Sequence, residues 1–262
     1  MQNASHPPVL LIIAGNDPSG GAGLAADIQA ATALGVHPAP VVAALTVQDT
    51  RDVNRLAAMD PGLVSDQAAR VFEDMPVAAV KLGLLASADI GRAVAALLRR
   101  HPGLPLVVDP VLRASGGSEL AEDELLRVYL EELFPLATLV TPNAAESRRL
   151  APTARDAATQ ARALLDTGAA HVLVKGADEA TPEVHNTLYS SDGRREESTW
   201  PRLPGVYHGS GCTLASAAAA LLARGETPQA AVREAQRYTW EALKRGWQLG
   251  HGQAIPNRQP RR

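Results

Sequence analysis

The chain of 262 residues (27.5 kDa) is 46% hydrophobic and 20% charged, a composition that suits a packed globular protein and excludes disordered, collagen-like and highly charged tail proteins. Its net charge of −3 and pI near 6.2 give no positive field for nucleic acid or an anionic membrane. Residues 1–8 lack signal-peptide features, the apolar runs are shorter than the roughly 20 residues of a membrane span, and the single Cys212 excludes an internal disulfide, so we expect a cytoplasmic protein.

Short apolar runs alternate with Ala- and Leu-rich segments of helical spacing. The expected strands are Val9–Ala14, Val41–Thr46, Val77–Leu82, Leu106–Asp109, Thr138–Thr141 and Val172–Lys175. The expected helices are Gly23–Leu34, Ser65–Asp74, Ala88–Arg100, Glu122–Phe134 and Asp156–Thr167. This alternation predicts an α/β fold with a doubly wound, mostly parallel sheet between two helical layers, and ligands of such sheets bind beyond the carboxyl ends of the strands.

The pattern changes after Lys175. Val184–Tyr189 and Arg195–Trp200 flank the turn Ser191-Asp192-Gly193, which predicts an antiparallel hairpin at the edge of the sheet. Two helices follow, from Cys212 to about Ala223 and from Pro228 to about Gln248. No linker divides the chain, so we expect a single domain over residues 1–262, with flexible tails at 1–8 and about 253–262.

A glycine-rich turn, His208-Gly209-Ser210-Gly211-Cys212, precedes the first of these helices. Uncovered backbone N–H groups and the helix dipole would make it an anion hole, and the same dipole would lower the pKa of the Cys212 thiol and allow it to act as a base. The alternative is an ordinary glycine turn with an inert cysteine. The turn lacks the lysine of a P-loop, and no strand precedes it as in a serine-hydrolase elbow.

A second glycine-rich turn, residues 14–23, links the first expected strand to the first helix. It differs from a dinucleotide fingerprint because Asp17 stands where the second glycine belongs, and no acidic residue ends Val41–Val47. We expect it to present its backbone to a small organic substrate near Asp17 or Asp27, the alternative being a turn built for tight packing.

Gln48 follows the second expected strand. Its amide offers an acceptor beside donors, which matches an aminopyrimidine edge that shows an amino group next to a ring nitrogen. The alternative is a surface glutamine in a loop.

Polar residues also follow three later strands. Asp109 and the segment Asn143 to Glu146 place carboxylates at neighbouring strand ends, where they could hold hydrated Mg²⁺ on ATP phosphates. Asn143 and Glu146 also fit a helix capping box, and both roles can hold together. Lys175 places a cation where a phosphate could lie, or is a surface charge. The histidines show no zinc-ligand spacing.

Together, Ala14–Gly23 and His208–Leu214 resemble the two signature segments of the hydroxymethylpyrimidine/phosphomethylpyrimidine kinases of thiamine biosynthesis, in the ribokinase-like superfamily. The segments between agree in order, so the resemblance covers nearly the whole chain. They are Leu45–Thr50, Val80–Leu85, Val107–Val111, Thr141–Glu146, Val172–Gly176 and Gly250–Gly252.

The resemblance implies transfer of the ATP γ-phosphate to 4-amino-5-hydroxymethyl-2-methylpyrimidine and then to its monophosphate, with ATP and Mg²⁺ as cofactors, and members often form homodimers. It implies that the pyrimidine pocket is lined by Gly15, Ala22, Asp27, Gln48, Leu84 and Val111. The anion hole would be Gly209, Ser210 and Gly211, with Cys212 helping to remove the alcohol's proton where sugar kinases usually carry an aspartate. Asp109, Asn143 and Glu146 would organise Mg²⁺, and Lys175 would lie near ATP.

This sequence differs from the family pattern at Asn16, Asp49, Leu84 and Ser210, and none of these differences removes a group that the chemistry needs. Two alternatives remain. A pyridoxal kinase of the same cysteine-bearing branch would phosphorylate a similar hydroxymethyl group on a pyridine. A pyrimidine- or nucleotide-binding sensor would keep the fold without turnover, although it would not need to retain Cys212 and the neighbouring glycine turn.

Overall fold

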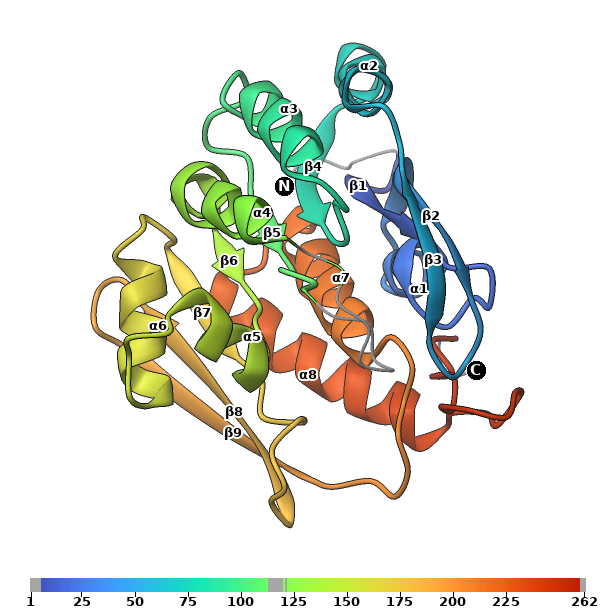
Figure 1. Ribbon diagram of the computed structural model, residues 1–262, viewed down its shortest axis with the longest axis vertical. Helices are drawn as coiled ribbons and strands as arrows, with labels where there is room; N and C mark the ends of the chain where they lie inside the picture. Colours follow the sequence, from blue (N-terminus) through green and yellow to red (C-terminus); the bar gives the residue numbers. More distant parts are fainter. Residues whose placement is uncertain (1–5, 113–119, 121, 260–262) are drawn as a thin grey trace.

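A nine-stranded sheet forms the centre of the computed structural model, which describes residues 6–112, 120 and 122–259 (Figure 1). Within these residues the strand order is β3-β2-β1-β4-β5-β6-β7-β8-β9. Strands β3 and β8 run antiparallel to the central strands, and β9 runs antiparallel to β8 and therefore in the direction of the central strands. The strands are β1 (Val9–Asn16), β2 (His37–Gln48), β3 (Val53–Ala58), β4 (Val77–Leu82), β5 (Leu106–Val108), β6 (Leu139–Val140), β7 (His171–Val174), β8 (Glu183–Ser190) and β9 (Arg195–Pro201).

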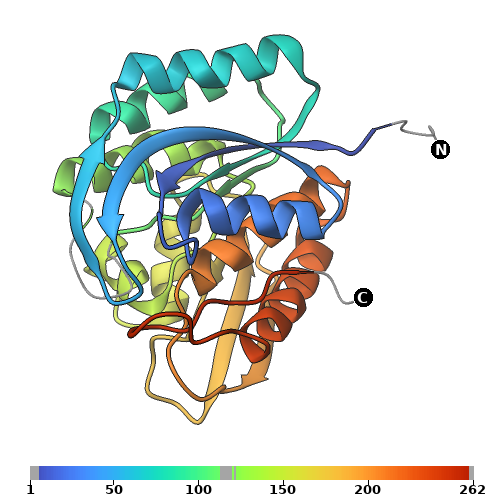
Figure 2. The same ribbon diagram turned by 90° about the vertical axis from the view of Figure 1, so that its right-hand side faces the viewer.

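Helices cover both faces of this sheet, as Figure 2 shows. One face carries α2 (Pro61–Asp74), α3 (Ala88–Leu98), α4 (Asp123–Val128) with its π-helical and 3₁₀ continuations η1 (Tyr129–Leu133) and η2 (Phe134–Leu136), α5 (Ala144–Leu150) and α6 (Ala157–Leu165). The other carries α1 (Gly23–Ala33), α7 (Ser210–Ala223) and α8 (Pro228–Lys244).

Strand β1 is apolar throughout because its side chains are buried on both faces of the sheet. Leu11 and Ile13 pack into the core beneath α2 and α3, whereas Leu10 and Ile12 pack into the core beneath α1 and α7. A strand buried on both faces has no polar side, so it reads as a continuous hydrophobic run. The expected three-layer αβα sandwich is therefore confirmed, as is the antiparallel edge hairpin of β8 and β9. None of the described helices is long and apolar enough to cross a membrane.

The sequence reasoning missed strand β3. Its residues pair with the end of β2, with Leu45 opposite Ala57 and Thr46 opposite Leu56. All of β3 is partly or fully exposed, and polar side chains at Asn54 and Arg55 interrupt its apolar pattern. An edge strand of this kind lacks the continuous hydrophobic signal that identifies the central strands.

The C-terminal segment is ordered over residues 253–259, so the expectation of a flexible tail there is wrong. The amide of Ala254 donates to the carbonyl of Val206 at 2.9 Å, and the amide of Asn257 donates to the carbonyl of Ala242 at 3.0 Å. Arg258 is only 1% exposed. Tertiary hydrogen bonds and the buried cation of Arg258 hold this segment in place. Neither could be predicted from its Pro- and Gln-containing sequence. Residues 1–5 and 260–262 of the two expected tails lie outside the described residues.

Candidate active site

A pocket of about 580 Å³ lies at the carboxyl ends of the parallel strands. Ligand sites of open α/β sheets occur at this edge because the loops that follow parallel strands meet there. Nearly all the residues that the sequence proposes for the site line the pocket: Gly15, Ala22, Gln48, Leu84, Asp109, Val111, Asn143, Glu146, Lys175, Gly209, Ser210, Gly211 and Cys212. Asp27 does not.

Asp27 lies beneath the pocket in a buried ion pair, which corrects its expected place in the lining. Its Oδ2 accepts a hydrogen bond from Lys81 Nζ at 2.8 Å, and its Oδ1 accepts one from Ser216 Oγ at 2.6 Å. Both charged side chains are fully buried. Burial raises the pKa of Asp27 even though Lys81 and Ser216 oppose the shift. For Lys81, burial alone would lower the pKa, but the carboxylate of Asp27 raises it.

Lys81 itself lines the pocket and was missed as a candidate site residue. It stands inside the apolar strand β4, and a lysine in such a strand was the signal in the sequence; in the structure it has no exposed surface.

The turn before α7 is built for close backbone approach. Gly209 caps the helix with φ +70°, and a Cβ there would lie 2.1 Å from the carbonyl oxygen of Gly21. Only glycine fits this position. Ser210, Gly211 and Cys212 follow in the first helical turn, where backbone N–H groups have no intrahelical acceptor. The geometry therefore supports an anion site in the pocket wall.

The first loop is organised around Asp17. Its carboxylate accepts hydrogen bonds from Ser19 and from the amide of Ala22, and His208 Nε2 lies 3.0 Å from its Oδ2. Burial opposes the charge, yet these partners, His208 foremost, lower the pKa of Asp17. Asp17 thus joins the two glycine-rich turns. Its side chain is absent from the pocket lining and has a structural role in the loop that we expected to lie near the substrate.

The pKa of the Cys212 thiol is raised, whereas the helix dipole was expected to lower it. Burial raises the pKa of its thiol to about 11, against the opposing effect of Lys81, while Asp27 and Asp109 raise it further. The dipole is outweighed because the thiolate faces two carboxylates in a poorly solvated site. In the ligand-free protein the group is a thiol at neutral pH.

This protonation state gives a direct prediction. Because Cys212 is the only cysteine, alkylation by iodoacetamide reports on it alone. We expect the alkylation rate to keep rising with pH beyond 9, the ordinary thiol value, since only the thiolate reacts. A rate that reaches its plateau below pH 9 would contradict this prediction, and a small-molecule thiol measured in parallel is the control.

Asp109 and Lys175 form a second buried pair across the strand ends. Lys175 Nζ donates to Asp109 Oδ1 at 2.9 Å, and Thr141 Oγ1 donates to the same oxygen at 3.0 Å. Although burial would raise it, the pKa of Asp109 is lowered by Lys175 and Lys81, so the carboxylate is ionised. Lys175 is largely buried and directed into the site, which argues against the surface-charge alternative.

Asn143 and Glu146 form the expected capping box at the start of α5. Asn143 Oδ1 accepts from the amide of Glu146 at 2.7 Å, and Glu146 Oε2 accepts from the amide of Asn143 at 2.8 Å. Burial raises the pKa of Glu146 to about 7; Lys175 opposes this shift and Asp109 adds to it. The capping role is confirmed, and it leaves both side chains in the pocket lining.

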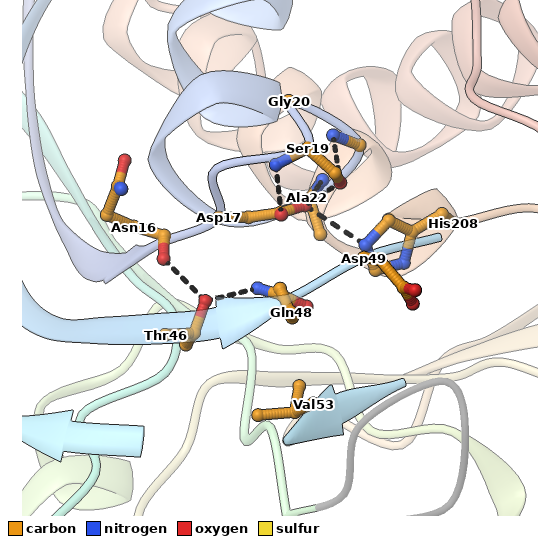
Figure 3. Close-up of polar contacts among 12 residues, drawn as sticks. Asn16, Asp17, Ser19, Gly20, Ala22, Thr46, Gln48, Asp49, Val53 and His208 are labelled. Carbon is orange, nitrogen blue, oxygen red and sulfur yellow. Dashed lines mark hydrogen bonds and ion pairs between the residues drawn. The ribbon is translucent and has the colours of Figure 1, made fainter. Parts of the chain in front are cut away.

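At the other end of the pocket, Gln48 is held in a fixed orientation (Figure 3). Thr46 Oγ1 donates its proton to the carbonyl of Asn16 at 2.8 Å and accepts a hydrogen bond from Gln48 Nε2 at 2.7 Å. A hydroxyl has one proton, and that of Thr46 is donated to Asn16. Thr46 can therefore only accept from Gln48, so the NH₂ end of the Gln48 amide faces Thr46.

A further set of lining residues could not be found from the sequence, because they come from separate elements. Gln236 Oε1 on α8 accepts hydrogen bonds from Asn186 Nδ2 at 2.9 Å and Trp200 Nε1 at 3.1 Å. The rings of Trp200 and Trp240 lie 6.2 Å apart. These side chains wall the pocket on the side of β8, β9 and α8.

Comparison with known proteins shows the family of this chain. The phosphomethylpyrimidine kinase family matches residues 17–257 of the chain. The chain belongs to this family. A hydroxymethylpyrimidine/phosphomethylpyrimidine kinase of Rhizobium meliloti is 39% identical over 256 residues, covering 94% of each protein. One from Escherichia coli is 37% identical over 253 residues, covering 92% of this chain and 94% of that protein.

The chain also matches one part of a longer relative. A thiamine biosynthesis bifunctional protein of Geobacter sulfurreducens is 38% identical, and the match covers 95% of this chain but only 51% of that protein. The chain thus spans about half the length of the bifunctional relative, whereas it spans nearly all of the kinases from Rhizobium and Escherichia.

Solved structures confirm the ribokinase-like fold expected from the sequence. A pyridoxal kinase from Staphylococcus aureus in complex with pyridoxal has a TM-score of 0.88 at 25% identity, covering 96% of this chain and 93% of that one. A phosphomethylpyrimidine kinase from Clostridium difficile has a TM-score of 0.76 at 31% identity, covering 90% and 99%.

Proposed function

We propose that this phosphomethylpyrimidine kinase family member transfers the γ-phosphate of ATP to the hydroxymethyl group of 4-amino-5-hydroxymethyl-2-methylpyrimidine, and then phosphorylates the monophosphate. One observation carries the proposal: a single pocket joins an oriented amide at Gln48 to the glycine turn at the start of α7. The relatives from Rhizobium and Escherichia, which the chain spans almost completely, carry both activities in their names.

Gln48 would recognise the pyrimidine edge. Its Nε2 has two protons, and Thr46 accepts one of them, so a second proton and the carbonyl oxygen remain for a ligand. A ring nitrogen accepts the proton while the neighbouring amino group donates to the carbonyl oxygen. Leu84 and Val53 supply apolar surface in the same part of the pocket.

The turn at Gly209–Gly211 would hold the transferring phosphoryl group. Phosphoryl transfer is governed by positioning and by stabilisation of charge on the equatorial oxygens, which backbone N–H groups at a helix start provide. Lys175 adds a buried cation that faces this turn, since a Cβ on Gly211 would lie 3.1 Å from its Nζ. Cys212 lies one residue further on, where it would accept the proton of the substrate alcohol or orient it.

Asp109 and Glu146 suit Mg²⁺ bound through water and ATP phosphates. Among the described residues, no group of three or more His, Cys, Asp or Glu side chains forms a protein cage for a metal. Mg²⁺ on a nucleotide needs only one or two protein oxygens, and these two carboxylates line the pocket, where both interact electrostatically with Lys175. When bound, Mg²⁺ would neutralise charge on the phosphates. Asn143 would support it indirectly by fixing Glu146.

The activity is tested by measuring ATP consumption with Mg²⁺ and one acceptor at a time, with each product identified by mass. The acceptors are the hydroxymethylpyrimidine, its monophosphate and pyridoxal. Turnover on both pyrimidines is the expected result. Turnover on the first alone would restrict the proposal to the first transfer.

Pyridoxal is included because a pyridoxal kinase from Staphylococcus aureus has the same fold, with a TM-score of 0.88. Preference for pyridoxal over the pyrimidine would overturn the assignment of substrate. Binding without turnover on all three acceptors would favour a sensor.

Gln48→Leu should weaken pyrimidine binding far more than ATP binding. The substitution removes the edge that pairs with the base, and a site built to hydrogen-bond its ligand loses about 1–3 kcal/mol when a partner is deleted. Pyrimidine affinity is measured by calorimetry, and ATP affinity by fluorescence of Trp200 and Trp240, which line the pocket.

The matched control is Gln67→Leu on α2, which is not part of the pocket lining and donates to the carbonyl of Leu63 in its own helix. It should leave both affinities unchanged. Equal losses for pyrimidine and ATP in Gln48→Leu would show that Gln48 does not read the base.

A further inference from the structure

The guanidinium of Arg258 lies buried under the junction of the two glycine-rich turns. Its Nη2 donates to the carbonyl of Gly21 and its Nη1 to the carbonyl of Gly20 at 3.4 Å, both in the first loop. Its Nε donates to Thr213 Oγ1 at 2.8 Å, on the first turn of α7. Arg258 thereby bonds to both signature segments with one planar group.

Thr213 passes this contact on to the glycine turn. Its hydroxyl accepts from Arg258 and donates to the carbonyl of Gly209 at 2.8 Å. Gly209 in turn packs so closely on Gly21 that no side chain fits between them. The fork of Arg258 therefore fixes the spacing of Gly21 and Gly209, and with it the direction of the N–H groups at the start of α7.

The chain reaches this position along a defined path. Gly252 and Gln253 donate to the hydroxyl and carbonyl of Thr50, beyond the end of β2, at 3.0 and 2.7 Å. The carbonyl of Ala254 then accepts from the amide of His208 at 2.9 Å. Figure 2 shows the segment returning toward α1. Arg258 lies just beyond residue 257, where the family match ends.

The guanidinium also places a positive charge next to the segment that carries Cys212, because its Nε donates at 2.8 Å to Thr213, the residue that directly follows Cys212. Burial lowers the pKa of Arg258, and the strongest charge interaction that opposes this is the one with Cys212. Other charged groups that face the thiol are Lys81 on β4, Asp27 on α1, Asp109 after β5 and Lys175 after β7. Among these, Arg258 alone is also bonded to the backbone of the first loop and to α7.

We propose that Arg258 is a positioning residue for phosphoryl transfer, which holds the anion turn against the substrate loop and supplies a buried positive charge beside Cys212. The positioning part rests on the proposed kinase function. The charge part is a property of the protein without substrate, so the two can be tested apart.

The experiment compares Arg258→Met, Arg258→Lys and the control Arg224→Met. Arg224 is exposed and donates to the carbonyl of Leu34, so it ties α7 to α1 at the end remote from the pocket. Each protein is assayed for kcat and KM with ATP and the hydroxymethylpyrimidine. The rate at which iodoacetamide alkylates Cys212 is followed against pH without substrate.

In Arg258→Met we expect kcat to fall about 10²-fold with little change in the pyrimidine KM, because small displacements of the reacting geometry act on the transition state. Alkylation should move to higher pH, since the thiolate loses a cation. Arg258→Lys keeps the charge but not the fork, so its alkylation profile should stay near the parent profile while kcat stays reduced. Arg224→Met should match the parent in both.

Parental kcat in Arg258→Met would overturn the positioning role, and an unshifted alkylation profile would overturn the charge role. If Arg258→Met does not fold, Arg258→Lys decides, because parental kcat in that variant would show that the fork is not needed. Absence of turnover in the parent protein would refute the kinase function and leave the alkylation result to judge the charge role alone.

Discussion

Cys212→Ala is expected to turn over the pyrimidine at least about 10²-fold more slowly than the parent, the usual contribution of a positioned proton acceptor. The side chain follows the anion turn directly and lines the pocket, so its removal acts at the reacting atoms. It is partly exposed, and alanine suits the first turn of a helix, so the denaturation midpoint should stay near that of the parent. Steady-state kinetics and urea unfolding measure the two quantities.

Cys212→Asp separates proton transfer from packing. Aspartate is charged at neutral pH, so if the position accepts the alcohol's proton, Cys212→Asp should exceed Cys212→Ala in turnover and show a different pH profile. Equal activity in the two variants would exclude a proton-accepting role, and parental activity in Cys212→Ala would assign the proton to another group. The thiol pKa of about 11 makes this test necessary, because little thiolate exists before substrate binds.

Lys81→Met should destabilise the protein by about 3–5 kcal/mol, since breaking a buried ion pair leaves an uncompensated charge. Asp27 would keep Ser216 as a partner but lose the ammonium at 2.8 Å. Urea unfolding measures the loss. The control is Arg70→Met, which breaks an exposed pair with Glu73 of similar length and should cost less than about 1 kcal/mol.

The pH dependence of the Lys81→Met variant gives an independent check. Without Lys81, burial raises the pKa of Asp27 unopposed by its main counter-charge. Above 3.8, the ordinary value, the folded state then binds a proton that the unfolded state lacks, so stability falls as pH rises. The quantity to compare is the difference in free energy of unfolding between the variant and the parent. If this difference did not change with pH, Asp27 would have found another counter-charge.

Much of the fold could be predicted because its central strands are buried on both faces. The alternation of Leu10 and Leu11 between two cores produces a continuous apolar signal that a single sequence shows directly. Part of the site could be predicted in the same way, since Asp109 and Lys175 each follow a buried strand, Gln48 ends β2, and the ends of parallel strands converge.

What was missed depends on contacts between distant segments. Helical spacing alone could not tell that Asp27 faces Lys81 under the pocket rather than the substrate above it. The raised thiol pKa of Cys212 follows from burial in the folded protein and, in addition, from two carboxylates that are far away in the chain. Strand β3 is an exposed edge strand held by its pairing with β2, and the segment around Arg258 is held by tertiary hydrogen bonds, so neither shows a continuous hydrophobic pattern.

The large separation in sequence between Arg258 and the loop that it supports bears on the order in which the site forms. Arg258 follows Gly21 by 237 residues, and all nine strands of the described sheet lie between residues 9 and 201. A ribosome therefore synthesises every strand before Arg258, so strand pairing can begin before the support beneath the glycine turns exists. We expect sheet formation to precede catalytic competence during synthesis.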